Sequence, residues 1–208
     1  MIDERTIAVT GGSLFAVAEG DGPPIVLLHA GVVDSRVWEP FVPLLTGAGY
    51  RTIRYDARGF GRSTSADVEF RREDDLLAVL DDFAVERAAL VGNSQGGRIA
   101  LDFAVTHPGR VAALVQLASG IGGLDVPTSP REQAVERRYQ EVDAGGDLEA
   151  LTGFELALWG AGVEQPVERL PRSCAPSSAR CSRWRTRTAA RSAARSPPIH
   201  RPSNASTA

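Results

Sequence analysis

The stretch LVGNSQGG, residues 90–97 of the 208-residue chain, decides the fold. It contains the pattern G-x-S-x-G, in which Ser94 stands between two glycines. An apolar run, Ala88–Val91, precedes the pattern, and a helical run, Gln95–Thr106, follows it. A serine on a sharp strand-to-helix turn stands clear of the sheet, and glycines on either side avoid a collision across that turn. This context predicts that Ser94 is a nucleophile; the alternative is a polar turn residue without chemistry.

Strand-like and helix-like runs alternate along the first half of the chain. The expected strands are Leu14–Ala18, Pro24–Leu28, Thr52–Tyr55, Ala88–Val91 and Val111–Leu117, and the expected helices are Trp38–Leu45, Glu73–Phe83 and Gln95–Thr106. Such alternation predicts an α/β fold with a doubly wound, mostly parallel sheet. Two later helical runs, Glu132–Asp143 and Leu148–Trp159, have no strand between them, as expected of a cap inserted over the sheet.

These patterns divide the chain into three segments. We expect residues 1–126 to form a core with six strands, one more than the five runs named above, residues 127–170 a partial helical cap, and residues 171–208 a disordered tail. The tail holds 8 of the 23 basic residues and none of the 26 acidic ones. Its only large apolar residues are Trp184 and Ile199, so it lacks the means to bury a core.

Two more motifs occur in order before the serine motif. The sequence Leu28-His29-Ala30-Gly31 ends one expected strand, and DARGFGRS, residues 56–63, follows the next. With these three motifs the chain resembles the α/β-hydrolase family over roughly residues 5–165. It is most similar to the small bacterial esterases, enol-lactonases and C–C-bond hydrolases. Ala30 departs from the family pattern, which usually has glycine at this position.

The resemblance implies roles for six residues. Ser94 would be the nucleophile, and the backbone N–H groups of Gly31 and Gln95 would form the oxyanion hole. Loop-supporting roles would fall to His29, Asp56 and Arg58. The family acts on small-molecule substrates without a cofactor, and the sequence contains no cluster of metal ligands.

The base and the acid that activate such a serine are not found. The family has an acid and then a histidine after the nucleophile, but His29 precedes Ser94 and His107 lies at the far end of the following helix. His200 falls in the basic tail, and Asp125 lies far along its loop. We therefore expect an impaired serine hydrolase. The alternative is a non-catalytic pseudo-hydrolase that binds a small ligand or a protein partner.

The tail has two readings. A shifted reading frame in GC-rich DNA would yield Arg, Ala, Ser and Pro in bulk, and would remove the last strands, the acid and the histidine together. An evolved basic tail, residues 172–208, would bind nucleic acid or an anionic surface, but it offers one aromatic residue for stacking on bases, which makes nucleic acid unlikely. Cys174 and Cys181 are expected to be unpaired thiols, because their spacing fits no structural zinc site.

Two more expectations concern the environment of the chain. No apolar run is long enough to cross a membrane, and Asp3 and Glu4 stand where a secretion signal would be basic, so we expect a cytoplasmic protein. In the family's strand order, Val111–Leu117 would be covered by later strands. Here we expect it to be an open apolar edge that favours aggregation and poor solubility.

Overall fold

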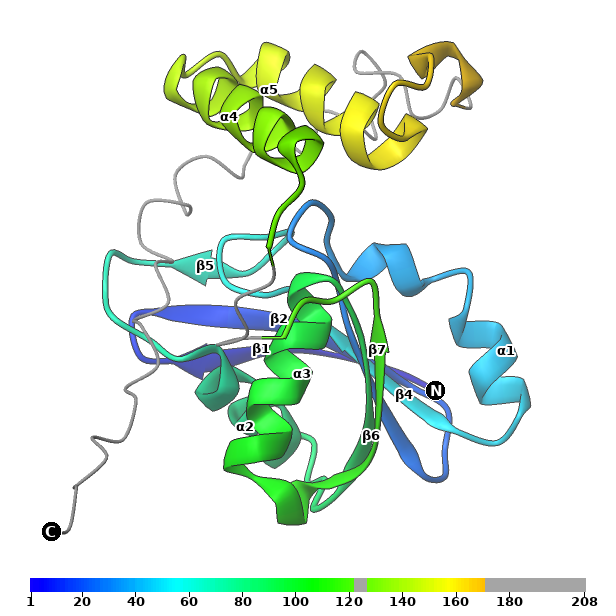
Figure 1. Cartoon of the computed structure of the whole chain (residues 1–208). Helices are drawn as coiled ribbons and strands as arrows, with labels where there is room; N and C mark the ends of the chain where they lie inside the picture. The colour runs from blue at the N-terminus through cyan, green and yellow to red at the C-terminus, as the bar shows by residue number, and fades with distance from the viewer. Residues whose placement is uncertain (122–126, 171–208) are drawn as a thin grey trace, which may run out of the picture.

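A seven-stranded sheet forms the centre of the described part of the chain (Figure 1). The structure is a computed structural model, and it describes residues 1–121 and 127–170. The strand order is β1-β2-β4-β3-β6-β7, and the short β5 pairs with β2. The strands are β1 (Ile2–Val9), β2 (Gly12–Glu19), β3 (Pro24–Leu28), β4 (Arg51–Tyr55), β5 (Thr64–Ser65), β6 (Ala88–Asn93) and β7 (Val111–Leu117).

The sheet is parallel at its centre and antiparallel on its N-terminal side. Strands β4, β3, β6 and β7 are parallel neighbours, which confirms the predicted α/β class and the parallel pairing. Strands β1 and β5 pair antiparallel with β2, which itself runs antiparallel to β4. The alternation of strands and helices did not predict β1 or β5, and the expected number of six strands is one fewer than the seven observed. The sequence IDERTIAV of β1 carries three charges, which are tolerated because Ile7 is its only fully buried residue.

Helices cover both faces of the sheet. On one face α2 (Arg72–Asp82) and α3 (Gln95–Thr106) pack on the main core, whose largest buried side chains include Phe103, Leu76, Leu80, Leu90 and Ile53. A short turn of helix, η2 (Pro108–Arg110), leads from α3 into β7. The other face carries a smaller cluster of Ile25, Leu27, Trp38 and Val42. The doubly wound arrangement predicted from the sequence is therefore present.

One helix prediction was wrong in its extent. The run Trp38–Leu45 is two pieces, η1 (Ser35–Trp38) and α1 (Val42–Gly47). Pro43 lies in the first turn of α1, where a residue without an N–H group is tolerated, and it therefore marks a helix start and not a helix interior.

Two helices lie beyond the C-terminal ends of the parallel strands (Figure 1). They are α4 (Pro130–Ala144) and α5 (Leu148–Glu155), continued by a π-helical turn, η3 (Leu156–Ala161), and by η4 (Val167–Arg169). Ser129 and Glu132 form a reciprocal capping box at the start of α4. The predicted pair of helices without an intervening strand is confirmed. The boundary at residue 126 stays a prediction.

Several predictions concern residues outside the described ranges. Asp125 lies in segment 122–126, and Cys174, Cys181 and His200 lie in segment 171–208.

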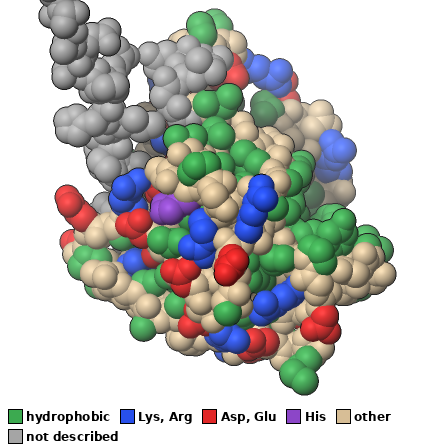
Figure 2. Space-filling view, turned by 90° about the horizontal axis from the view of Figure 1, so that it is seen from below, with side chains coloured by type: hydrophobic (Ala, Val, Ile, Leu, Met, Phe, Trp, Pro, Cys, Tyr) green, Lys and Arg blue, Asp and Glu red, His purple; other side chains and the backbone are tan. Residues whose placement is uncertain are grey.

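In the described ranges, no helix combines the length and the apolar character needed to cross a membrane. On the face turned away from the cap, acidic and basic side chains are interspersed among the described residues (Figure 2).

Strand β7 lies at one end of the strand order, as the sequence predicts. Val115 and Leu117 are 45% and 43% exposed, which are large values for apolar residues of a strand. An exposed apolar strand at the edge of a sheet offers unpaired N–H and C=O groups to other chains.

Candidate active site

The backbone at Ser94 has the strained form of a nucleophile elbow. Ser94 lies between the end of β6 and the start of α3, with φ 51° and ψ −113°. L residues with a side chain rarely adopt a positive φ, and such strain gathers at functional sites. The Ser94 N–H group donates a hydrogen bond to the Leu117 carbonyl oxygen of β7 at 2.8 Å. The side chain of Ser94 is exposed to solvent at the cap end of the sheet.

The glycines around Ser94 are required by backbone contacts. A Cβ atom on Gly92 would overlap the backbone of Gly96, and a Cβ atom on Gly96 would overlap the carbonyl group of Leu28. A Cβ atom on Gly97 would come within 2.7 Å of the Ser119 Cβ atom. The turn, the start of α3 and the end of β3 thus approach one another as closely as a backbone allows.

The two predicted oxyanion donors lie on facing segments. Gln95 is the first residue of α3, where N–H groups have no partner within the helix. Gly31 follows β3, and a Cβ atom there would lie 2.6 Å from Gln95 Oε1, so the Gln95 side chain packs over Gly31. Gln95 Nε2 is buried and has no hydrogen-bond partner among the described residues. The positive end of the α3 dipole favours negative charge at this point.

Both ring nitrogens of His29 are bound to the backbone. Its Nδ1 lies 2.8 Å from the Ala30 carbonyl oxygen, and its Nε2 accepts a hydrogen bond from the Ala57 N–H group at 2.9 Å. A neutral ring with the proton on Nδ1 satisfies both contacts. Burial lowers the pKa of His29, because the charged imidazolium loses its hydration. His29 therefore joins two loops, and neither of its ring nitrogens is free to accept a proton from Ser94.

Asp56 joins the loops around the end of β4. Its carboxylate accepts hydrogen bonds from the N–H groups of Ser35 at 2.9 Å and Arg62 at 2.8 Å. A Cβ atom on Gly61 would overlap this carboxylate, so the loop can close around it only with glycine there. Ser63 Oγ donates to the Asp56 carbonyl oxygen at 2.6 Å, which fixes the backbone of the same residue.

Arg58 forms a buried ion pair with α2. Its guanidinium contacts the Asp75 carboxylate through Nε and Nη2, with a shortest distance of 2.7 Å, and the two side chains are 4% and 5% exposed. The ring of Phe70 lies 4.3 Å from the Arg58 guanidinium carbon. Arg58 therefore anchors the loop after β4 to α2, and does not point its charge at Ser94.

The structure does not bring a general base to Ser94 in the ranges that it describes. His107 lies at the C-terminal end of α3, where it contacts Thr106 Oγ1 at 2.9 Å and stacks on Phe103 at 4.7 Å. His29 is held as described above. Within the described segments there is also no group of three or more metal-ligating side chains. The described residues therefore include a candidate nucleophile and candidate oxyanion donors, but no histidine that is placed to accept the Ser94 proton.

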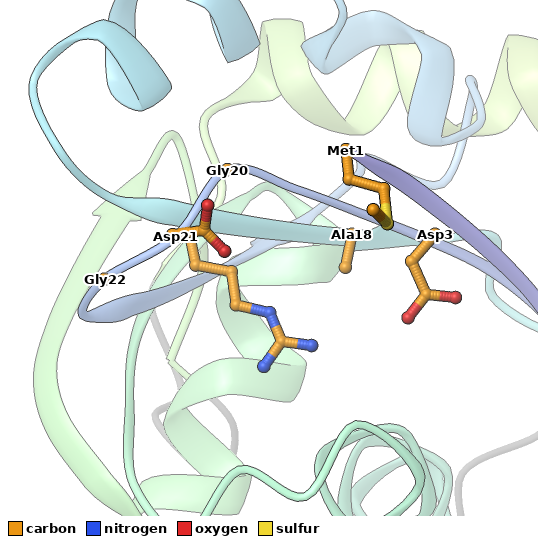
Figure 3. Close-up of a pocket in the computed structure, with 7 residues that line it drawn as sticks. Met1, Asp3, Ala18, Gly20, Asp21 and Gly22 are labelled. Carbon is orange, nitrogen blue, oxygen red and sulfur yellow. The ribbon is translucent and has the colours of Figure 1, made fainter.

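A hollow of about 340 Å³ lies elsewhere (Figure 3). Its lining residues are Met1, Asp3, Ala18, Gly20, Asp21, Gly22 and Arg51. Arg51 begins β4 and pairs with Pro24 at the start of β3, so the hollow lies at the N-terminal ends of the parallel strands. Ser94 follows the C-terminal end of β6. The hollow is thus at the opposite end of the sheet from the candidate site.

Sequence reasoning missed three contacts that hold the site together. They are the packing of the Gln95 side chain on Gly31, the Arg58–Asp75 pair, and the contact of Ser119 with Gly97. Of these contacts, only the Arg58–Asp75 pair could have been suspected from the sequence, because Asp75 is a charged residue on the apolar face of its helix, next to Leu76. The other two depend on how separate segments approach in three dimensions.

Comparison with known proteins identifies the family to which this fold belongs. A family model described as the alpha/beta hydrolase fold matches residues 23–147. Epoxide hydrolase B of Mycobacterium tuberculosis is 36% identical over 138 residues, which are 61% of this chain and 39% of the relative. A 2-hydroxy-6-oxononadienedioate/2-hydroxy-6-oxononatrienedioate hydrolase of Paraburkholderia phymatum is 42% identical over 106 residues, 48% of this chain and 37% of the relative.

Among solved structures, an esterase from Exiguobacterium antarcticum superposes with a TM-score of 0.62 at 24% identity, over 71% of this chain and 58% of that one. At this identity the likeness concerns the fold alone. The chain spans about two fifths of the length of the two curated relatives named above. The matched region contains the His29 loop, the Asp56 loop and the Ser94 elbow. The chain belongs to the α/β-hydrolase fold family.

Proposed function

We propose that this chain is a serine hydrolase that cleaves an ester, a lactone or a related acyl bond of a small molecule through Ser94. The observation that carries the proposal is the strained backbone of Ser94 at the start of α3, with φ 51°. Strain of this kind costs of order 1–3 kcal/mol and persists only where the surroundings impose it. The close packing around the turn imposes it here, and Gly92, Gly96 and Gly97 permit that packing, because a Cβ atom at any of them would block a backbone or side-chain approach.

The geometry supports a two-step reaction. Ser94 Oγ bonds to the acyl carbon, the hydroxyl proton leaves to a base, and the acyl oxygen becomes an oxyanion facing the N–H groups of Gly31 and Gln95. The oxyanion then collapses, the bond to the leaving alcohol breaks, and that alcohol takes up a proton. Water releases the acid from the acyl-enzyme in the second step. Gln95 follows Ser94 directly in the chain, and Gly31 lies against the Gln95 side chain.

We further propose that activity is impaired in the chain as given. Neither His29 nor His107 is placed to accept the Ser94 proton, for the reasons described above. Oxyanion stabilisation and binding alone leave roughly 10³–10⁴-fold acceleration over water in serine proteases stripped of triad members. A rate of that order is what the described residues support.

A reactive-serine probe tests the proposal. The full chain is treated with a fluorophosphonate, which phosphonylates a serine only where its hydroxyl is activated. We expect slow labelling that Ser94→Ala abolishes and Ser119→Ala preserves, since Ser119 lies against Gly97 of α3 and alanine keeps the Cβ atom of that contact. Labelling that survives Ser94→Ala would remove Ser94 from the role of nucleophile.

The second candidate function is a pseudo-hydrolase that binds a small ligand or a protein partner. It is favoured by the engagement of both His29 ring nitrogens with backbone groups, which leaves the elbow without a base in the described ranges. A chain that unfolds cooperatively and yet shows no probe labelling would support this binder over the hydrolase.

Three expectations from the sequence stay predictions. A shifted reading frame is tested on the nucleotide sequence from codon 165 onward: another frame with apolar strands, an acid and a glycine–histidine pair would support it. Nucleic-acid binding by residues 172–208 is tested by salt-titrated binding of DNA to the full chain, where steep loss of binding with salt would support it. The cytoplasmic location is tested by cell fractionation.

A further inference from the structure

The two outer strands of the sheet differ sharply in charge. Strand β1 carries Asp3, Glu4 and Arg5, and Arg5 forms ion pairs with Asp3 and Asp82. Strand β7 has the sequence VAALVQL, without a charged residue or a proline. Charges and prolines are the usual means by which a sheet edge resists pairing with another chain. Among the strands that the structure describes, the β1 edge is therefore protected by charge, and the β7 edge has neither a charge nor a neighbouring strand.

The hydrogen-bonding direction along β7 can be assigned. The Leu117 carbonyl oxygen accepts from Ser94, so the backbone of Leu117 points toward β6. Backbone groups alternate along a strand, and the register with β6 is regular from Ala113 to Leu117. The N–H and C=O groups of Leu114 and Gln116 therefore point outward, to the side where no described strand pairs.

The regular part of β7 is complementary to itself. If two copies pair antiparallel about Val115, each Leu114 lies opposite a Gln116, and the outward groups of both form hydrogen bonds. Val115 then lies opposite its own counterpart, and Leu117 lies opposite Ala113. Antiparallel pairing of two identical strands about a two-fold axis uses the same surface on both copies and closes after two chains. The paired strands themselves contain no charged residue.

The tail of the same chain is a poor occupant for this edge. Residues 171–208 contain only two large apolar residues, Trp184 and Ile199, which are 15 positions apart. Eight arginines and five prolines are spread along it, and proline interrupts a hydrogen-bonded ladder. A β7 strand from a second copy offers both the apolar side chains and the matching hydrogen-bond pattern.

We propose that β7 is a dimerisation edge, on which a second copy of this chain adds its own β7 antiparallel with Val115 on the two-fold axis. The two sheets then continue into one. A pair of strands this short buries less than the ~1,200–2,000 Å² typical of stable interfaces, so the dimer should dissociate on dilution, with a Kd of about micromolar order. The proposal is independent of catalysis, and Ser94→Ala should dimerise as the parent chain does.

Cysteine cross-linking tests the register. In a background with Cys174 and Cys181 changed to serine, Val115→Cys places two thiols on residues whose Cα atoms are about 4.5 Å apart in a non-hydrogen-bonded pair, within the range of a disulfide. The control is Val105→Cys on α3, where the side chain is 74% exposed. We expect fast formation of a covalent dimer for Val115→Cys and slow random formation for Val105→Cys. Equal rates for the two variants would overturn the proposed register.

Sedimentation equilibrium tests the dimer itself. The full chain should pass from monomer to dimer with rising concentration and go no further. Val115→Lys should stay monomeric because two ammonium groups would meet on the axis, whereas Val105→Lys should dimerise as the parent does. Thermal unfolding of both lysine variants controls for folding. A chain that stays monomeric at about 100 µM, forms larger species, or dimerises equally well with Val115→Lys would overturn the proposal.

Discussion

The carboxamide of Gln95 packs directly over Gly31, so that a Cβ atom on residue 31 would lie 2.6 Å from Gln95 Oε1 and 3.4 Å from its Cδ atom. This contact joins the first residue of α3 to the loop after β3. It sets the spacing between the two backbone N–H groups that we propose as oxyanion donors.

Gly31→Ala should therefore destabilise the chain by about 1–3 kcal/mol, because its methyl group must displace the Gln95 side chain or the loop. Urea unfolding measures the effect. Removing the obstacle with Gln95→Ala should recover most of the loss in the double variant. Gly109→Ala is the matched control, since no heavy atom lies within 4 Å of a Cβ atom there. Additive losses from the two single changes would show that the side chains do not meet.

Gly96→Ala should be more damaging than Gly31→Ala. Its methyl group would overlap the Leu28 carbonyl group and lie 2.8 Å from the His29 carbonyl oxygen, and backbone atoms cannot move aside as a side chain can. We expect a loss of about 3 kcal/mol or more in the free energy of unfolding, or failure to fold.

Gly153→Ala serves as the control for that change. A Cβ atom at Gly153 in α5 meets nothing within 4 Å, and alanine is the better helix former by ~0.5–1 kcal/mol. Both variants can be compared by thermal unfolding. If Gly96→Ala unfolded at the temperature of the parent chain, the close approach of α3 to β3 would be wrong.

Breaking the Arg58–Asp75 pair from one side should cost about 3–5 kcal/mol, because Arg58→Met leaves a buried carboxylate without its partner. The double variant Arg58→Met with Asp75→Leu should be closer to the parent in stability. Glu141→Ala breaks the exposed Arg138–Glu141 pair, for which we expect less than about 1 kcal/mol. Chemical denaturation of the four chains distinguishes these outcomes.

Acid should destabilise the chain through His29. Burial holds the pKa of His29 below its ordinary value of 6.5, so below that pH the unfolded chain binds a proton that the folded chain excludes. The contribution of His29 is complete above about pH 6.5 and falls as the pH decreases, by at most about 1.4 kcal/mol per pH unit. Urea unfolding at about pH 7.5 and about pH 5.5 measures this loss.

The variant His29→Asn tests the assignment of that slope. It should be less stable at neutral pH, because it loses one of the two backbone contacts, and its stability should depend less on pH. His107→Gln should keep the slope of the parent chain. The prediction would be contradicted if the pH dependence of the free energy of unfolding disappeared with His107→Gln and survived His29→Asn.

The fold could be predicted from the sequence because apolar runs and glycine turns act locally. The run Pro24–Leu28 reads as a buried strand, and it is one. The run Gln95–Thr106 is a helix with the expected bounds. Strand β1 was missed because three successive charged residues, Asp3 to Arg5, interrupt any apolar pattern, and because its pairing with β2 depends on a partner rather than on its own sequence.

The site could be predicted in part. The sequence pattern located the turn at Ser94, since a strand, a glycine pair and a helix surround it in the chain. It could not reveal that Gln95 covers Gly31, because 64 residues separate them in sequence and only the packing of α3 against β3 brings them together. Nor could it show that Ala57 binds the second nitrogen of His29.

The hydrogen bond from Ser94 to Leu117 has a consequence for local opening of the sheet. It ties the strained turn to the outermost strand, and outer strands are the first parts of a sheet to detach in native-state fluctuations. When Leu117 leaves β6, Ser94 loses its backbone acceptor and its positive φ is no longer enforced from that side. The population of the strained turn is thus limited by the local opening of β7, and amide hydrogen exchange at Ser94 reports the free energy of that opening.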